Sequence, residues 1–153
     1  MALKPDRIET QTDISFFCNT AATRGGIVSV VTGGSGVAMD DANSVVAYAA
    51  SASGLPVGLL LNDVKSGLDL TRQHINYHKD EVVVGSKVTV LRVGQVTTDV
   101  IATGVTNPGA GRPAYLAANG QLTAVAGANQ PQVGQWLSSM DSEGFAKVSI
   151  NIT

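Results

Sequence analysis

Apolar and polar residues alternate most clearly in the run SKVTVLRVGQVTTDVIATG, residues 86–104. Val88, Val90 and the later Val and Ile residues alternate there with Thr, Lys and Arg. This period of two is typical of a β-strand with one buried face. Gly94 and Gln95 interrupt the run at a place where a hairpin would turn, so the pattern predicts two strands joined at that dipeptide.

Other short runs also predict strands that are separated by turns. Asn119 and Gly120 interrupt AYLAANGQLTA, residues 114–124, and both tolerate the positive φ angles of a type I′ hairpin turn. The polar residues 141–144 separate two further apolar runs. The remaining apolar runs predict a strand, a turn at GGSG and a strand in residues 27–39, strands or a short helix in residues 44–52, a strand in residues 55–64, and a long loop leading into a strand in residues 65–84.

The first part of the chain is polar and irregular, apart from the stretch DISFFCN at residues 13–19. Ile14, Phe16 and Phe17 place apolar side chains in a short extended segment. We expect residues 1–24 to form an extended N-terminal arm and residues 25–153 to form a single β domain. The arm then has to bury its aromatic side chains against that domain or against a neighbouring molecule.

These patterns together predict the fold class. Closely spaced short strands with turn residues between them, and no long helical periodicity, indicate an all-β protein of about eight to ten short strands. We expect a β-sandwich or a small β-barrel that carries the N-terminal arm.

Composition narrows the classes of partner. The 10 Lys and Arg residues and 12 Asp and Glu residues give a net charge of −2, and the basic residues are scattered, so we expect no nucleic-acid partner. We also expect no membrane span and no secretion signal, because the sequence lacks apolar runs of the required length. Cys18 is the only cysteine, which favours synthesis in a reducing cytoplasm.

The best candidate for metal chemistry is the pair His74 and His78. Zinc sites use three or four ligands, and the sequence shows no HExxH motif or paired-cysteine motif. We therefore favour polar or interface histidines over a metal site. With Arg72 and Tyr77 beside it, His74 is a candidate residue of a subunit interface.

No other residue pattern forms a convincing catalytic constellation. Cys18 is more often a small buried hydrophobic residue than a nucleophile, and GGSG at residues 33–36 favours a hairpin turn over a phosphate loop. We expect Trp136 to be a core residue rather than an interface anchor. Residues 104–113 predict a surface loop that either connects strands or contacts a partner. We expect no catalytic residue, no cofactor and no enzymatic activity.

The order of several segments is similar to that of a known family. DISFF is followed by RGG at residues 24–26, GSKVTVLRVGQVTTDVI at residues 85–101, GRPAYLAANGQLT at residues 111–123 and VGQWLSSMDSEGFAKVSINI at residues 133–152. In this order the chain resembles the small capsid decoration (cement) proteins of tailed bacteriophages.

The resemblance implies a structural protein of the virion, on the outer capsid surface of the phage head, that stabilises the head through subunit contacts. Its implied partners are the major capsid protein and further copies of itself, commonly in a homotrimer. We expect Ile14, Phe16 and Phe17 to contact the capsid or an adjacent subunit, and we expect Arg72, His74 and Tyr77 to face a subunit interface. The alternatives are a phage tail, baseplate or host-surface binding module and a metal-dependent enzyme using His74 and His78.

Overall fold

The structure is a computed structural model that describes residues 3–32, 45–48, 54–66, 81–102 and 108–152. The described part consists of strands, turns and one short 3-10 turn, and it contains no α-helix. The strands are β1 (Ile8–Cys18), β2 (Ile27–Thr32), β3 (Val45–Tyr48), β4 (Pro56–Leu60), β5 (Asp63–Lys65), β6 (Glu81–Val83), β7 (Lys87–Thr98), β8 (Pro113–Leu116), β9 (Leu122–Thr123), β10 (Gln132–Trp136) and β11 (Ala146–Asn151).

The main sheet has nine strands in the order β1-β3-β2-β4-β7-β11-β10-β8-β9. An additional antiparallel pairing joins β1 to β7. Strands β1, β3, β2, β4 and β7 therefore form a closed ring, which we call the first ring. The predicted all-β, barrel-like fold is confirmed.

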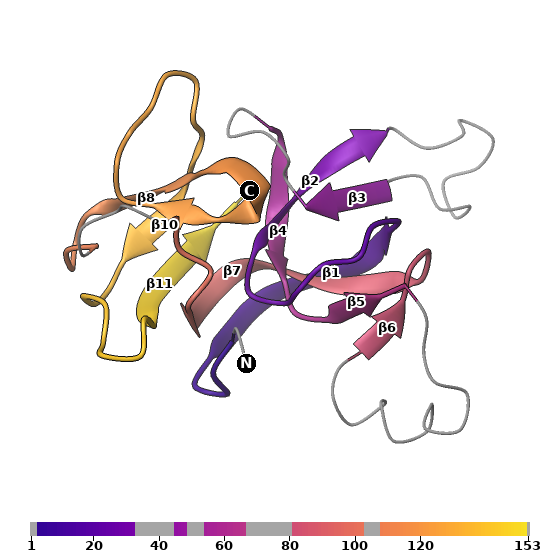
Figure 1. Cartoon of the computed structure of the whole chain (residues 1–153), viewed down its shortest axis with the longest axis horizontal. Coiled ribbons are helices and arrows are strands. Elements are labelled where there is room, and N and C mark those ends of the chain that lie inside the picture. The colour runs from indigo at the N-terminus through magenta and orange to yellow at the C-terminus, as the bar shows by residue number, and fades with distance from the viewer. Residues whose placement is uncertain (1–2, 33–44, 49–53, 67–80, 103–107, 153) are drawn as a thin grey trace.

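The far end of the sheet also returns to β7. The segment just after β7 pairs with β9, because Leu122 N donates to Val100 O at 3.0 Å and Ala102 N donates to Leu122 O at 2.9 Å. Strands β7, β11, β10, β8 and β9 form this second part of the sheet. Figure 1 shows β8, β10 and β11 gathered at one end of the molecule and β2, β3, β5 and β6 at the other, with β7 passing between them.

Two buried clusters fill the molecule. A large core contains Trp136 and most buried side chains of β8, β10 and β11, and a small core surrounds Cys18. Strand β4 supplies Leu59 to the large core and Leu60 to the small core. Successive side chains of a strand point to opposite faces, so β4 is buried on both faces. This explains why its sequence is a continuous apolar run.

The turn at Asn119 and Gly120 has the predicted conformation. Asn119 has φ 58° and ψ 32°, Gly120 has φ 70°, and Gln121 N donates to Ala118 O at 3.3 Å. Both central residues thus have the positive φ of a type I′ turn. The turn joins β8 to β9, and Leu116 of β8 pairs with Leu122 of β9.

The prediction of a hairpin turn at Gly94 and Gln95 is wrong, because both residues lie inside the continuous strand β7. Gly94 pairs with Glu9 of β1 on one side and with Ile150 of β11 on the other. A Cβ atom at Gly94 would overlap the carbonyl oxygen of Ile8. Glycine is required here by the close approach of β1, not by a turn.

The predicted arm also differs from the structure. Residues 1–24 contain β1, which runs antiparallel to β7 from Ile8 to Phe17. Before this strand, Leu3 is 2% exposed and belongs to the large core, and at its end Cys18 is fully buried in the small core. This segment is therefore a strand of the sheet, and the predicted boundary between residues 24 and 25 separates strands of one ring.

Candidate functional site

The first candidate contact surface is the outer edge of β1, from Ile8 to Phe16, which we call the β1 edge. One side of this segment is hydrogen-bonded to β7. On the other side, only Phe17 and Cys18 pair with a strand, namely β3. Within the described part of the chain, the β1 edge therefore presents unpaired backbone N–H and C=O groups. Such an edge is able to accept a strand from another molecule.

The three residues predicted to contact a partner lie at the end of β1, but they are not equivalent. Ile14 is 65% exposed. Phe16 is partly buried against the small core, and Phe17 is half-buried with the Lys87 Nζ atom 5.4 Å from the centre of its ring. Ile14 is therefore the most accessible of the three, whereas Phe16 helps to hold β1 in its own domain.

Ile14 lies within a local irregularity of β1. The register between β1 and β7 shifts between Asp13 and Phe16. The Asp13 carboxylate accepts hydrogen bonds from the backbone N–H of Ser15, at 2.8 Å, and from the Ser15 hydroxyl. Partial burial raises the pKa of Asp13, but the Ser15 hydrogen bonds, aided by the charge of Arg92, outweigh it and leave this pKa below its ordinary value. The ionised carboxylate thus stabilises the bulge in which Ile14 lies.

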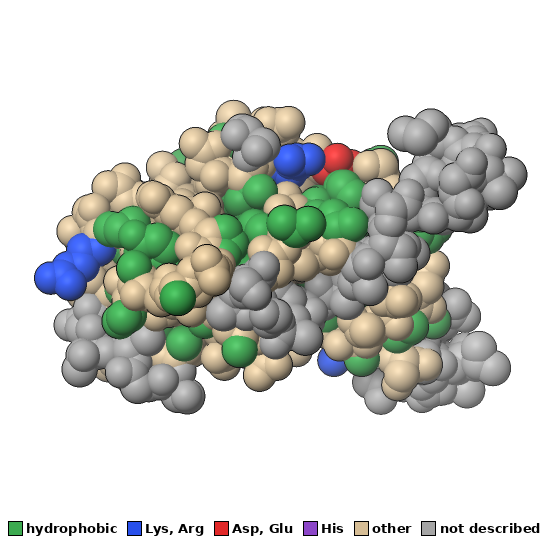
Figure 2. All heavy atoms as spheres, turned by 90° about the horizontal axis from the view of Figure 1, so that it is seen from above, with side chains coloured by type: hydrophobic (Ala, Val, Ile, Leu, Met, Phe, Trp, Pro, Cys, Tyr) green, Lys and Arg blue, Asp and Glu red, His purple; other side chains and the backbone are tan. Residues whose placement is uncertain are grey.

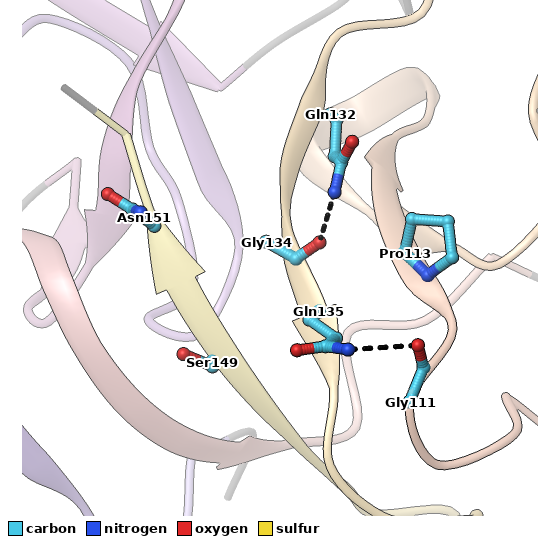
Figure 3. A pocket seen from close by; sticks show the side chains of 7 residues that line it. All are labelled: Gly111, Pro113, Gln132, Gly134, Gln135, Ser149 and Asn151. Carbon is cyan, nitrogen blue, oxygen red and sulfur yellow. Dashed lines mark hydrogen bonds between the residues drawn. The ribbon is translucent and has the colours of Figure 1, made fainter.

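The second candidate surface is a groove of about 530 Å³ on the outer face of β8, β10 and β11 (Figure 3). We call it the polar groove. Its lining combines three carboxamides, one hydroxyl, two glycines and a proline, and it contains no ionisable side chain. The lining residues are Gly111, Pro113, Gln132, Gly134, Gln135, Ser149 and Asn151.

Gly134 lies on the central strand of the polar groove. A Cβ atom at this position would overlap the carbonyl oxygen of Ser149 in the neighbouring strand β11, so the sheet requires glycine here. The missing side chain leaves bare backbone between its polar neighbours. Sequence reasoning missed the groove, although outward-facing uncharged residues in the last two strands were a usable signal.

Exposed apolar side chains are not confined to β1. Figure 2 shows hydrophobic side chains gathered across the middle of one face, with few charged side chains beside them. Leu55, just before β4, is 73% exposed, and Val125, between β9 and β10, is 64% exposed. Exposure alone therefore does not single out Ile14. Ile14 and Ile8, which is 55% exposed, differ from Leu55 and Val125 because they lie on the β1 edge, whose outer side pairs with no described strand.

The other predicted site residues have mixed outcomes. Arg72, His74, Tyr77 and His78 lie outside the described residues, as does the GGSG stretch. Cys18 is fully buried and its thiol donates to Thr20 O at 3.3 Å. Trp136 is fully buried in the large core, as predicted.

Within the described residues, no group of three or more His, Cys, Asp or Glu side chains is placed to hold a metal ion. The described part also has no helix with the length and apolar character needed to cross a membrane.

Comparison with known proteins adds no relative: no protein-family model and no curated protein matches this chain.

Proposed function

We propose that this chain is a structural protein of a tailed-phage virion that binds the outer surface of the head and stabilises the shell. The β1 edge is the observation that carries this proposal. It combines a long strand, whose outer side pairs with no described strand from Ile8 to Phe16, with the exposed apolar side chain of Ile14. Its partner is the major capsid protein, and the protein acts by contact rather than by catalysis.

The backbone of the β1 edge supports docking by strand addition. A partner segment that pairs with this edge gains main-chain hydrogen bonds, while side-chain contacts determine specificity. Because β1 is held along its other side by β7, the edge is already extended before binding. A preformed edge loses less conformational entropy on binding than a segment that must first become ordered.

The side chains of the β1 edge limit the kind of partner. Ile14 favours an apolar side chain opposite it. Arg7 lies just before the strand and forms an ion pair with Glu9, with 2.6 Å between Nε and Oε1. Identical contacts between the β1 edge and the capsid, repeated over a shell, give a large total stabilisation even when each contact is weak.

We further propose that the protein assembles as a homotrimer, with Arg72, His74 and Tyr77 at the subunit interface. This part of the proposal rests on the resemblance alone. A mass measurement by analytical ultracentrifugation tests it: a trimer that dissociates when Tyr77 is replaced by Ala supports the proposal, and a monomer at all concentrations contradicts it.

The role of Ile14 is tested by replacing it with Asp. This change places a charge in the proposed contact, so we expect co-sedimentation with expanded heads to weaken by about tenfold or more. Because the side chain is exposed, the variant should remain folded. Val125→Asp is the matched control, since Val125 is equally exposed at 64% and lies away from β1. Equal binding by the two variants would exclude the β1 edge as the contact.

A further inference from the structure

The polar groove has a chemistry that differs from that of the β1 edge. Each carboxamide offers both hydrogen-bond donors and an acceptor, and the Ser149 hydroxyl offers both as well. Gln132, Gln135 and Asn151 supply the carboxamides. The groove therefore presents closely spaced donors and acceptors without a formal charge.

Two of these carboxamides are held in place by the protein. Gln135 Nε2 donates to Gly111 O at 2.9 Å, and Gln132 Nε2 donates to Gly134 O at 3.3 Å. Figure 3 shows the oxygen of the Gln135 amide pointing away from Gly111, toward the side where Ser149 lies. Side chains that are already oriented lose less conformational entropy when a ligand binds.

The lack of charge excludes several classes of ligand. A phosphate, carboxylate or metal ion would lose its hydration without gaining an opposite charge in this groove. A ligand that matches the groove is neutral and carries many groups that both donate and accept. The hydroxyl groups of a sugar ring have this property.

The pairing of β10 argues against an extended peptide. Strand addition needs a free strand edge. Strand β10, which forms the floor of the groove, pairs with β11 on one side and with β8 on the other. The groove therefore lies on a sheet face whose backbone groups are already engaged, and only side chains and a few carbonyl groups remain for recognition.

The apolar part of the groove also suits a sugar. Pro113 lines it, and its side chain is partly exposed. The proline ring offers an apolar surface against which the C–H groups of a sugar can pack. The volume of about 530 Å³ is in the range of small-ligand sites.

We propose that the polar groove binds a short neutral saccharide, which is a function separate from attachment to a phage head. Gln135 on β10 and Asn151 on the neighbouring strand β11 provide hydrogen bonds. Gly134 provides the open floor, and Pro113 provides apolar contact. The class of ligand is a neutral hexose or N-acetylhexosamine, free or at the end of a glycan.

The test is a titration of the ¹⁵N-labelled full chain, followed by NMR, with glucose, galactose, mannose, N-acetylglucosamine, maltose and lactose. We expect at least one of these sugars to shift the backbone resonances of Gly111, Gly134 and Gln135, with a Kd on the order of 1 mM. Failure of all six to shift these resonances at up to about 100 mM overturns the proposal.

Matched variants separate recognition from folding. Gln135→Leu removes hydrogen-bonding groups from the groove, and we expect about tenfold weaker binding. Gln11→Leu makes the same change on the exposed strand β1, away from the polar groove, and should leave sugar binding unchanged. If Gln135→Leu proves unfolded, Asn151→Leu on the neighbouring strand replaces it. Unchanged binding in a folded groove variant contradicts the proposal.

Two further ligands test whether the groove is specific for neutral saccharides. Glucuronate should bind no better than glucose, because no cation lines the groove. N-acetyl-tri-alanine amide, a peptide without charged groups, should leave the groove resonances unshifted. If either ligand binds the groove more strongly than glucose does, the saccharide assignment is overturned. Head binding by the Gln135→Leu variant should stay normal, so failure of this proposal is distinguishable from failure of the proposed function.

Discussion

Gly94 and Gly134 are sites where a single methyl group is expected to disrupt the sheet. In each case an added Cβ atom would overlap a backbone carbonyl oxygen, that of Ile8 or of Ser149. Backbone atoms of paired strands cannot move without loss of the pairing. We therefore expect Gly94→Ala and Gly134→Ala each to lower the free energy of unfolding by about 3 kcal/mol or more, measured by denaturant titration.

Gly144→Ala is the control for these substitutions. Gly144 has φ +88°, and nothing lies within 4 Å of an added Cβ atom. Only the strain of a left-handed backbone is then expected, at about 1–2 kcal/mol. Equal losses at all three positions would contradict the close-approach explanation.

Asp141 is expected to make stability depend on pH. The backbone N–H of Phe145 donates to its Oδ1 atom at 2.8 Å, that of Glu143 donates to the same atom at 2.9 Å, and Lys4 Nζ lies 3.4 Å from Oδ2. These contacts, with the Phe145 hydrogen bond as the largest cause, hold the pKa of Asp141 below its ordinary value of 3.8. The ionised form is thus favoured by folding.

The direction of this pH dependence follows from the linkage between proton binding and folding. A carboxylate with a lowered folded pKa stabilises the protein above its unfolded pKa, and this contribution is lost as the pH falls through the folded pKa. We expect the free energy of unfolding to decline between about pH 5 and pH 2, and to decline less in Asp141→Asn. Asp6→Asn serves as control, since the Asp6 carboxylate has only a 3.9 Å contact with Lys147. An identical pH profile for wild type and Asp141→Asn would refute this role.

At the scale of elements, β1 is expected to be necessary for folding. Removal of residues 1–19 deletes the strand that closes the first ring, together with Leu3 of the large core and Cys18 of the small core. We expect the truncated chain to lose the cooperative thermal unfolding transition and the dispersed NMR spectrum of the full chain. The exposed-site variant Ile14→Asp should keep both. Cooperative unfolding of residues 20–153 at the stability of the full chain would show instead that β1 is dispensable.

Local signals predicted the elements well and their pairing poorly. Asn119 and Gly120 were predictable because the positive φ angles that they adopt depend on the residues themselves. Gly94 was misleading, since its role depends on Ile8, a residue that is distant in sequence but adjacent in space. The same limit applies to the arm: its polar residues suggested an extended segment outside the β domain, yet Leu3 and Cys18 anchor both ends in the two cores.

The candidate sites also combine features that local sequence predicts with features that depend on residues distant in sequence. Ile14, Phe16 and Phe17 stood out by composition, but only pairing in the sheet distinguishes the exposed Ile14 from the partly buried Phe16. The polar groove was missed because it depends on three strands and on a glycine between them. Single residues such as Gln135 carry no signal of their own.

At the scale of the whole molecule, β7 links the two parts of the sheet. It pairs with β1 along one side, and with β4 and then β11 along the other. Because both parts share this strand, they are expected to move as a unit. A rigid body of this kind holds the β1 edge in place, which suits a protein whose proposed function is contact with a shell.

The measurement that tests the proposed function most directly is an electron cryo-microscopy image of phage particles with the bound protein. We expect density on the outside of the head, with β1 as the strand nearest the major capsid protein. Density on the tail or baseplate, or particles that bind no protein at saturating concentration, would contradict the proposed function.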